Sequence, residues 1–392
     1  MLRSLFFQHV AQTSPSPMAL EISHGRGNYL YDTSGKTYLD LIAGISVSNI
    51  GHSNPIVVEA IKNQAGKYLH TLVYGEHIQS AQVELAKAIA DTLPELLDQV
   101  LFLNSGSEAI EAAMKLAKRA TGRFEIVSCH LAYHGSSHGA LSLNGDEYYK
   151  RNFRPLLPGI RQIHYGSFSD LELISEKTAC VIIETVQGEA GIKVGCAQYF
   201  QALRKRCTDV GALLILDEIQ TGFGRTGTFW GFQKLDIQPD VVVMAKGMGG
   251  GMPLGAIAAS QNLLGCFTQN PVLGHISTFG GHPVCCAASL ATLKFIQENK
   301  LTEQVEAKEL AFRNGLVDSQ ISEIRSSGLM LAVELGSFDK VQKVISFCLE
   351  NGLITDWFLH CNTALRIAPP LTITIDEIEF ACELIKKALT DC

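Results

Sequence analysis

The sequence predicts an α/β protein with a mainly parallel central sheet and a smaller α+β domain formed by both chain ends. Short apolar runs rich in β-branched residues alternate with segments of helical periodicity, which is typical of such a sheet. The runs are apolar nearly throughout, as in parallel strands that are covered on both faces. Of 392 residues, 46% are hydrophobic and 18% charged, so the chain can bury a large core and is not intrinsically disordered.

The N-terminal segment, residues 1–51, is rich in turn signals. Within it, Tyr31-Asp32-Thr33-Ser34-Gly35 indicates a hairpin or loop. The apolar cluster Leu5–Phe7 is shorter than the roughly 7–15 residues of a secretory signal. A transit peptide rests on Arg3 alone and is the weaker interpretation.

The central segment, residues 52–282, carries the strands of the predicted sheet. They are Val100–Leu103, Glu125–Ser128, Cys180–Ile183, Leu213–Leu216 and Val241–Met244. The helical spacing of Ile110, Met114 and Ala117 predicts a helix after the first strand. Ser105-Gly106-Ser107-Glu108 supplies a capping box at its start. We expect residues 52–282 to form one large domain with right-handed crossovers.

The C-terminal segment, residues 283–392, begins with helical patterns. Short strands are then expected at Leu329–Glu334 and Ala364–Ile367, and helices at 337–351 and 376–389. Together with residues 1–51 it is expected to form the smaller domain.

Charge and composition exclude several classes of protein. A net charge of −7 argues against a general nucleic-acid binder. The longest apolar runs, such as Ala212–Leu216, are far shorter than the roughly 20 residues of a membrane-spanning helix. Eleven cysteines without framework spacing indicate reduced thiols in a cytoplasmic protein, and the neighbours Cys285 and Cys286 are expected in the core.

Several patterns that could carry chemistry lack the context they need. Gly222–Gly227 matches G-x-G-x-x-G but neither follows a strand directly nor opens a helix, which disfavours a nicotinamide enzyme. Lys246–Gly251 lacks the Ser or Thr of a Walker loop. His130, His134 and His138 stand four apart, but a glycine interrupts the helix that would align them, so no metal site is predicted.

Asp217 and Lys246 are the most informative pair. Each follows a predicted strand, Asp217 directly and Lys246 after one residue. Ligands of open α/β sheets bind outside the carboxyl ends of strands, so both side chains are expected to face one crevice. Two ordinary surface residues would be the simplest explanation, but the glycines after Lys246 let backbone approach and desolvate it. A desolvated lysine can form a Schiff base, and an aspartate facing a pyridinium nitrogen is its partner in pyridoxal phosphate (PLP) enzymes.

Asn104-Ser105-Gly106-Ser107 joins a strand to a helix N-terminus. Free backbone N–H groups and the helix dipole favour an anion there, although a plain helix cap would suffice alone. Because Asp217 and Lys246 belong to the same sheet, phosphate binding becomes the better interpretation. Tyr133 follows the next strand and could stack on a cofactor ring.

On these residues the chain resembles the class III aminotransferases, PLP enzymes of fold-type I, from about Gly27 to Ile385. The most specific stretch is Leu214–Gly227, followed by Pro239-Asp240 and Ala245-Lys246-Gly247. Further similar blocks are Asn104–Ala109, Val186–Gly191, Ser277–Gly281 and Leu365–Pro370.

The resemblance implies roles for the cofactor-binding residues. Lys246 would be the Schiff-base lysine and the proton shuttle, Asp217 would keep the pyridine nitrogen protonated, and Gln220 would contact the ring hydroxyl. The remaining cofactor contacts would be Ser105, Gly106 and Ser107 at the phosphate, and Tyr133 and His134 at the ring.

The resemblance also implies how substrates and a second subunit take part. Arg366 would bind a substrate carboxylate, and Glu189 would pair with Arg366 when that carboxylate is absent. Thr278 would reach the phosphate of the neighbouring subunit, which implies a homodimer with shared active sites. Glu184 would have a supporting role only.

Within the class, the chain resembles acetylornithine and ornithine aminotransferases, which implies transfer of a terminal amino group to 2-oxoglutarate. Ile45 stands where the ornithine enzymes carry Tyr. Ser136 stands where these enzymes usually carry an Arg that grips a distal carboxylate, and Ser cannot replace a bidentate guanidinium. Possible substitutes are Arg151, Arg154 and His138.

Other functions stay open at this point. The donor could be another ω-amine, such as 4-aminobutyrate, lysine or a diamine. A PLP aminomutase needs no separate acceptor, but the retained Glu189 and Arg366 favour a transaminase, because a charge switch is useful only with two different substrates. A non-catalytic binding protein is disfavoured by Lys246 and Asp217 together.

Overall fold

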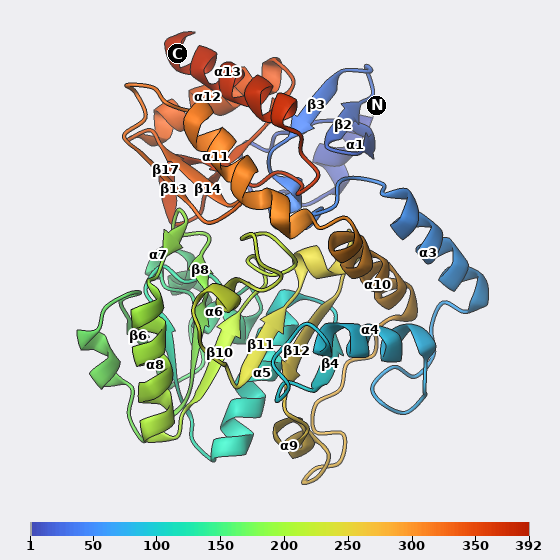
Figure 1. Cartoon of the computed structure of the whole chain (residues 1–392), viewed down its shortest axis with the longest axis vertical. Coiled ribbons are helices and arrows are strands. Elements are labelled where there is room, and N and C mark those ends of the chain that lie inside the picture. The colour runs from blue at the N-terminus through green and yellow to red at the C-terminus, as the bar shows by residue number, and fades with distance from the viewer. Residues whose placement is uncertain (1, 392) are drawn as a thin grey trace.

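Seven strands form the large sheet in the middle of the chain (Figure 1), in the order β4-β12-β11-β10-β7-β5-β6. They are β4 (Gln99–Leu103), β5 (Glu125–Cys129), β6 (Ile160–Ile163), β7 (Thr178–Glu184), β10 (Leu213–Asp217), β11 (Val241–Met244) and β12 (Gly255–Ala259). Neighbours pair in parallel except at β12, which is antiparallel to both β11 and β4. This computed structural model describes residues 2–391.

The predicted fold class is therefore confirmed, and all five predicted strands lie in this sheet. β6 and β12 are not among the five predicted strands. The segment Gly255–Ala259 reads Gly-Ala-Ile-Ala-Ala, and only one of these residues favours strands. Its pairing with β11 and β4 overrides that weak local preference.

Different helices cover the two faces of the large sheet. α5 (Gly106–Thr121) packs on β11 and β12, and α8 (Ala197–Val210) packs on β7 and β10. In β10, Ile215 belongs to the apolar cluster that contains α5, whereas Leu214 and Leu216 belong to the cluster that contains α8. Burial on both faces explains why the strands are apolar nearly throughout.

The start of α5 differs in one detail from the predicted capping box. Ser105 is the N-cap, and its side chain accepts from the Glu108 N–H at 3.2 Å, as predicted. The Glu108 carboxylate, however, accepts from the backbone and side-chain nitrogens of Asn104 rather than from Ser105 N–H. This bond fixes the residue that connects β4 to the helix.

The two chain ends share one small sheet, in which β15 (Leu353–Ile354) pairs in parallel with β3 (Thr37–Asp40). β1 (Ile22–Arg26) and β2 (Tyr29–Asp32) complete it, and the predicted hairpin joins β2 to β3. A second sheet has the order β13-β14-β17-β16. Its strands are β13 (Glu323–Ser326), β14 (Leu331–Glu334), β16 (Asp356–Phe358) and β17 (Cys361–Ile367).

In Figure 1 the N-terminal strands and the C-terminal helices lie together above the large sheet. Those helices are α11 (Val305–Gly315), α12 (Phe338–Glu350) and α13 (Ile375–Asp391). Such sharing agrees with a small domain built from both ends, and we propose that the domain boundaries fall near residues 51 and 282.

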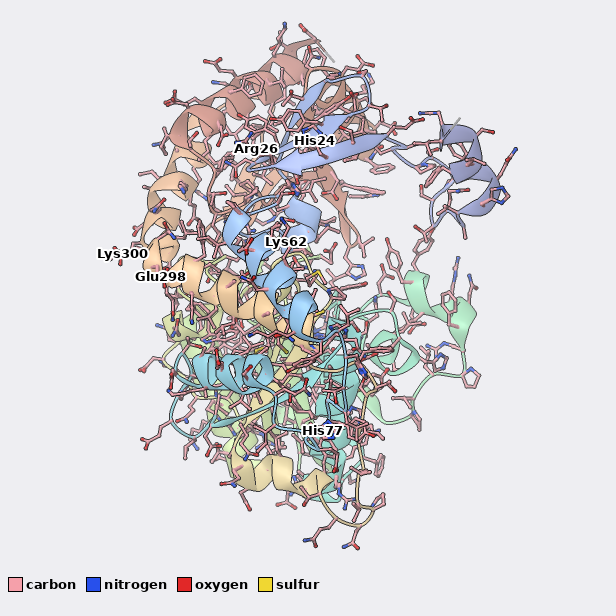
Figure 2. The ribbon with its side chains drawn as sticks, turned by 90° about the vertical axis from the view of Figure 1, so that its right-hand side faces the viewer. His24, Arg26, Lys62, His77, Glu298 and Lys300 are labelled. Carbon is pink, nitrogen blue, oxygen red and sulfur yellow. The ribbon has the colours of Figure 1, made fainter. Side chains whose placement is uncertain are left out.

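α10 (Pro283–Glu298) packs against α3 (Pro55–Lys67) and α4 (Ser80–Ala90), and it buries Cys285 and Cys286 as predicted. Figure 2, turned by 90°, shows Lys62 on α3 below His24 and Arg26 of β1. The short elements are α1 (Leu2–His9), α2 (Ala43–Ser46), α6 (His138–Ser142), α7 (Glu147–Lys150), α9 (Gln261–Leu264), β8 (Val186–Gln187) and β9 (Lys193–Val194). No helix within residues 2–391 has the length and apolarity needed to cross a membrane.

Candidate active site

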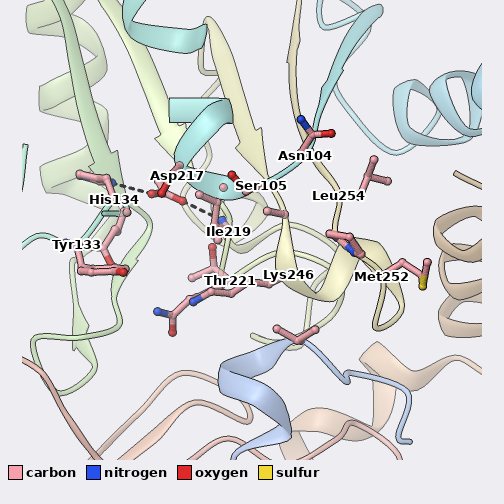
Figure 3. A pocket seen from close by; sticks show the side chains of 18 of the residues that line it. Asn104, Ser105, Tyr133, His134, Asp217, Ile219, Thr221, Lys246, Met252 and Leu254 are labelled. Atoms are coloured by element: carbon pink, nitrogen blue, oxygen red, sulfur yellow. Dashed lines mark hydrogen bonds and ion pairs between the residues drawn. The ribbon is translucent and has the colours of Figure 1, made fainter. Parts of the chain in front are cut away.

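A cavity of about 460 Å³, here called the cofactor cavity, opens at the carboxyl ends of β5, β7, β10 and β11 (Figure 3). Asp217 ends β10, and Lys246 follows β11 after one residue, so the topology brings both side chains to one cavity. The predicted cofactor-binding residues that line it are Ser105, Gly106, Ser107, Tyr133, His134, Asp217, Gln220 and Lys246. Thr278 lies elsewhere, as described below.

The Asp217 carboxylate is fixed from two sides. Its Oδ2 lies 2.7 Å from Nδ1 of His134, and its Oδ1 accepts from the Ile219 N–H at 2.9 Å (Figure 3). Both partners of the first bond are buried, with side chains 0% and 3% exposed. Burial alone would lower the pKa of His134, but the hydrogen bond and charge of Asp217 raise it above its ordinary value. His134 and the Ile219 N–H therefore hold the Asp217 carboxylate in one orientation.

Glu184, given only a supporting role by the sequence, is a buried member of the cofactor cavity. It accepts from the Tyr133 N–H at 3.1 Å and from the Gly188 N–H at 3.0 Å. Burial raises the pKa of Glu184 to about 7, although the charge of His134 opposes this. The side chain thus ties together the two loops that carry Tyr133 and Glu189.

Lys246 adopts a left-handed backbone conformation with φ of 49° at the start of a short 3-10 turn. Gly247 must be glycine, because an added Cβ would lie 2.4 Å from Nδ2 of Asn49. Within residues 2–391, Nζ of Lys246 makes no hydrogen bond, and burial lowers the pKa of Lys246 to about 8, although the charge of Glu189 opposes it. A larger share of this amine is unprotonated near neutral pH, which makes it a nucleophile and a base.

Two loops meet at the N-terminus of α5. Gly135 has φ of 126°, and an added Cβ there would lie 2.0 Å from Oγ of Ser107. Ser107 Oγ in turn accepts from the Ser136 N–H at 3.1 Å. This close packing places Gly106 and Ser107, with the free N–H groups of a 16-residue helix, at the wall of the cavity.

A second cavity, of about 390 Å³ and here called the substrate cavity, shares Tyr133 and Lys246 with the first. Arg366 and Glu189 form a bidentate ion pair in its wall, with N–O distances of 2.9 and 2.7 Å and both side chains 4% exposed. Burial would raise the pKa of Glu189, but the charge of Arg366 dominates and lowers it to about 2. Gln220 donates to Glu189 Oε1 at 3.2 Å, so it connects the two cavities.

Sequence reasoning missed Asp356, which also lines the substrate cavity. Asp356 lies in β16 directly opposite Arg366 of β17, and its Oδ1 is 2.9 Å from Nε of Arg366. Nothing in the local sequence marks this residue, because the pairing depends on the register of two strands.

Thr278 and the proposed substitutes for an arginine at position 136 lie outside both cavities. Thr278 is exposed, and its carbonyl accepts from Nε2 of His70 at 2.8 Å. Arg154 pairs with Glu147, His138 bonds to the Pro155 carbonyl, and Arg151 lies over the Tyr148 ring. Ser136 Oγ lies 3.1 Å from the Tyr133 hydroxyl.

The three histidines spaced by four residues point to different partners. His134 bonds to Asp217, His138 to a carbonyl, and His130 stacks on His164 at 4.4 Å between ring centres. No group of three or more His, Cys, Asp or Glu side chains within residues 2–391 is placed to hold a metal ion.

The cofactor cavity fits pyridoxal phosphate. The helix N-terminus at Gly106 and Ser107 suits its phosphate, and Asp217 suits its pyridinium nitrogen. Tyr133 presents an aromatic ring, and Lys246 offers an unpartnered, desolvated amine.

Comparisons with known proteins agree with this chemistry. A model of the family "Aminotransferase class-III" matches residues 10–389. The acetylornithine aminotransferase of Methanosarcina acetivorans is 39% identical over 376 residues, which cover 94% of this chain and 91% of that protein. The acetylornithine aminotransferase of Methanopyrus kandleri is 38% identical over 370 residues, 93% of each chain.

Solved structures show the same fold over the whole chain. The ornithine aminotransferase of Toxoplasma gondii superimposes with a TM-score of 0.91 at 29% identity, covering 100% of this chain and 94% of that one. An (S)-enantioselective omega-transaminase from Thermomicrobium roseum has a TM-score of 0.91 at 30% identity, covering 99% and 97%. The chain therefore belongs to the class III aminotransferases and is a transaminase whose cofactor is pyridoxal phosphate.

Proposed function

We propose that this enzyme moves the terminal amino group of an ω-amino donor, of the acetylornithine or ornithine kind, to 2-oxoglutarate. The observation that carries the proposal is the bidentate ion pair of Arg366 with Glu189 beside Lys246. A guanidinium that binds a side-chain carboxylate in this geometry can bind a substrate carboxylate in the same way once Glu189 leaves. One site can then accept an amine and an oxo acid in turn. The names of the curated relatives support a donor of this kind.

When bound, pyridoxal phosphate takes up the amino group and withdraws electrons from the carbon that carries it. Lys246, with its pKa lowered to about 8, removes the proton from that carbon in the half-reaction with the amine. It returns a proton in the half-reaction with the oxo acid. Asp217, fixed by the 2.7 Å contact with His134, would accept a hydrogen bond from the protonated ring nitrogen of the bound cofactor. The donor carbon becomes an aldehyde while the oxo acid becomes glutamate, so no outside oxidant is needed.

Arg366→Ala should separate the two substrates. We expect kcat/KM for 2-oxoglutarate to fall about 100-fold, because the substituted site leaves the substrate carboxylate without a bidentate partner. The amine half of the reaction should change much less, since the donor does not use the guanidinium. Steady-state kinetics with varied amine and varied oxo acid measure both values.

The matched control is Lys205→Ala, which removes an exposed cation paired with Asp209 on α8. It should change neither constant, because exposed pairs contribute little. Equal losses for amine and oxo acid in Arg366→Ala would show that Arg366 is not the carboxylate-binding residue.

We also propose a homodimer with shared sites and a cytoplasmic location. The exposed position of Thr278 outside both cavities of its own chain supports a contact across a subunit interface. Light scattering of the purified protein would give its mass, and a monomer with full activity would contradict the shared site.

A further inference from the structure

The carboxylate of Glu189 has partners besides the guanidinium of Arg366. Its Oε2 accepts from Nη2 of Arg366 at 2.7 Å and also from the backbone N–H of Leu359 at 3.1 Å. Its Oε1 accepts from Nη1 of Arg366 at 2.9 Å and from Nε2 of Gln220 at 3.2 Å. A substrate carboxylate that displaces Glu189 enters the same group of donors. The resemblance implies a contact of Gln220 with the cofactor, but it gives no role to the Leu359 N–H.

The Leu359 N–H is held in place independently of the Glu189 carboxylate. Leu359 begins the two-residue turn between β16 and β17. The Tyr149 hydroxyl donates to the Leu359 carbonyl at 2.9 Å, and the His360 N–H donates to the backbone carbonyl of Glu189 at 3.0 Å. Neither bond uses the Glu189 carboxylate, so the turn keeps both of them when that carboxylate leaves.

The guanidinium of Arg366 is likewise held by groups other than Glu189. Its Nη2 donates to the Trp357 carbonyl at 3.0 Å, and its Nε lies 2.9 Å from Oδ1 of Asp356. Both residues belong to β16, the strand that Leu359 follows directly. One strand and its turn therefore fix the guanidinium and the Leu359 N–H relative to each other, and Glu189 is the member of the cluster that can leave.

The charges around this position suit an exchange of one carboxylate for another. The cavity wall holds two cationic side chains, Arg366 and Lys246, and two anionic ones, Glu189 and Asp356. A substrate carboxylate that takes the place of Glu189 restores the same balance. It also gives the Leu359 N–H an acceptor, which that group otherwise loses when Glu189 leaves. N–H donors that are already in position stabilise an anion without further reorganisation.

We propose that the backbone N–H of Leu359 is a further carboxylate-binding group, which donates to the 2-oxo acid together with the guanidinium of Arg366. The inference rests on the proposed function, in which Arg366 binds that carboxylate, and it adds a backbone donor to the same site. During the amine half-reaction Glu189 occupies these donors. During the oxo acid half-reaction the substrate carboxylate occupies them instead.

Leu359→Pro removes this N–H, and Leu359→Ala is the matched control, which loses the side chain but keeps the N–H. A proline is compatible with the site, because Phe358 lies in a strand and Leu359 is not among the described residues with positive φ. Both changes are made in the Glu189→Ala enzyme, where this side chain no longer competes for the donors. Single turnovers of the loaded, aminated enzyme with 2-oxoglutarate give an apparent Kd and a rate constant at saturation.

We expect the apparent Kd for 2-oxoglutarate to be about tenfold higher with Leu359→Pro than with Leu359→Ala, because a hydrogen bond to a charged group is lost. The rate constant at saturation should differ by less than about twofold, since the N–H binds the carboxylate and does not touch the reacting carbon. A ratio of the two Kd values below about threefold in the Glu189→Ala enzyme overturns the proposal.

The same two variants in the enzyme that retains Glu189 give a readout that damage to the fold would not produce. Glu189 and the substrate carboxylate use the same donor, so its loss weakens the ion pair and the substrate complex alike. The ratio of the Kd values for Leu359→Pro and Leu359→Ala should therefore fall below about threefold in this background. Structural damage would raise Kd equally in both backgrounds, and equal ratios overturn the proposal.

Hydrogen exchange tests the same donor without a proline and decides the question if Leu359→Pro does not fold. In the loaded Glu189→Ala enzyme, saturating glutarate, a dicarboxylate without an oxo group to react, should slow exchange of the Leu359 amide at least about tenfold. Unchanged exchange overturns the proposal.

Arg366→Ala separates this inference from the proposed function. If Arg366→Ala leaves the affinity for 2-oxoglutarate unchanged, the proposed function fails. If Arg366→Ala weakens it while Leu359→Pro and Leu359→Ala bind equally well in the Glu189→Ala enzyme, only the assignment of the Leu359 N–H fails.

Discussion

The cofactor cavity and the substrate cavity meet at Tyr133 and Lys246, yet they are built in different ways. The predicted cofactor-binding residues of the cofactor cavity lie at the ends of strands of one sheet or within a few residues after them, so strand pairing sets their placement. The substrate cavity is lined by three segments that are far apart in the sequence. They carry Ile45 near the N-terminus, Glu189 between β7 and β10, and Arg366 of β17. The common chemistry of the enzyme thus rests on one rigid layer, whereas substrate choice rests on how distant segments are held together.

Arg225 holds those segments. It is fully buried, and its guanidinium donates to the carbonyls of Leu329 and Pro369 and to the side chain of Asn49. Asn49 follows the segment of Ile45, and Pro369 follows Arg366 by three residues. One side chain therefore fixes both ends of the substrate cavity relative to the loop that follows Asp217.

The largest effect should come from the residue shared by both cavities. Lys246→Ala removes the amine that moves the proton, so we expect turnover to fall by at least about 10²–10⁴-fold with every donor. The absorbance of lysine-bound cofactor should disappear, and steady-state turnover with a visible spectrum measures both. The exposed Lys87→Ala is the control. Normal turnover in Lys246→Ala would refute the assignment of the whole site.

The residues of the cofactor cavity could be predicted from the sequence more fully than those of the substrate cavity. Asp217, Lys246 and Ser105–Ser107 could be located because each lies at the end of an apolar strand or shortly after it, and strand ends are local features. Asp356 could not, since its contact with Arg366 depends on strand register across ten residues. The sheet's parallel core was predictable from its apolar runs, but the small-residue strand β12 was not. Contacts between distant segments leave no local pattern to read.

Arg225→Met should loosen the substrate cavity more than the cofactor cavity. Three oxygens lose their donor in a buried place, so we expect a loss of about 3 kcal/mol in the free energy of unfolding. The KM for 2-oxoglutarate should rise more than the dissociation constant for the cofactor. Denaturant unfolding and cofactor titration measure these two quantities.

Arg313→Met is a matched control, because this exposed arginine also donates to a backbone carbonyl, that of Ile324, at 3.0 Å. It should cost less than about 1 kcal/mol, as exposed hydrogen bonds do. A loss in Arg225→Met no larger than in this control would mean that the buried guanidinium does not hold the segments.

The smallest effect concerns the proton on Lys246 in the cofactor-free chain. Burial lowers the pKa of Lys246 from 10.5 to about 8, so between these values the unfolded chain binds more protons than the folded one. The free energy of unfolding should therefore rise with pH across that window relative to Lys246→Met, which has no proton to lose. Urea midpoints at several pH values from 8 to 10 on both proteins measure it, with the exposed Lys87→Met as the reference substitution. A constant difference between wild type and Lys246→Met across this range would show that the amine is not desolvated, and the cofactor cavity would then lack the feature that makes its lysine reactive.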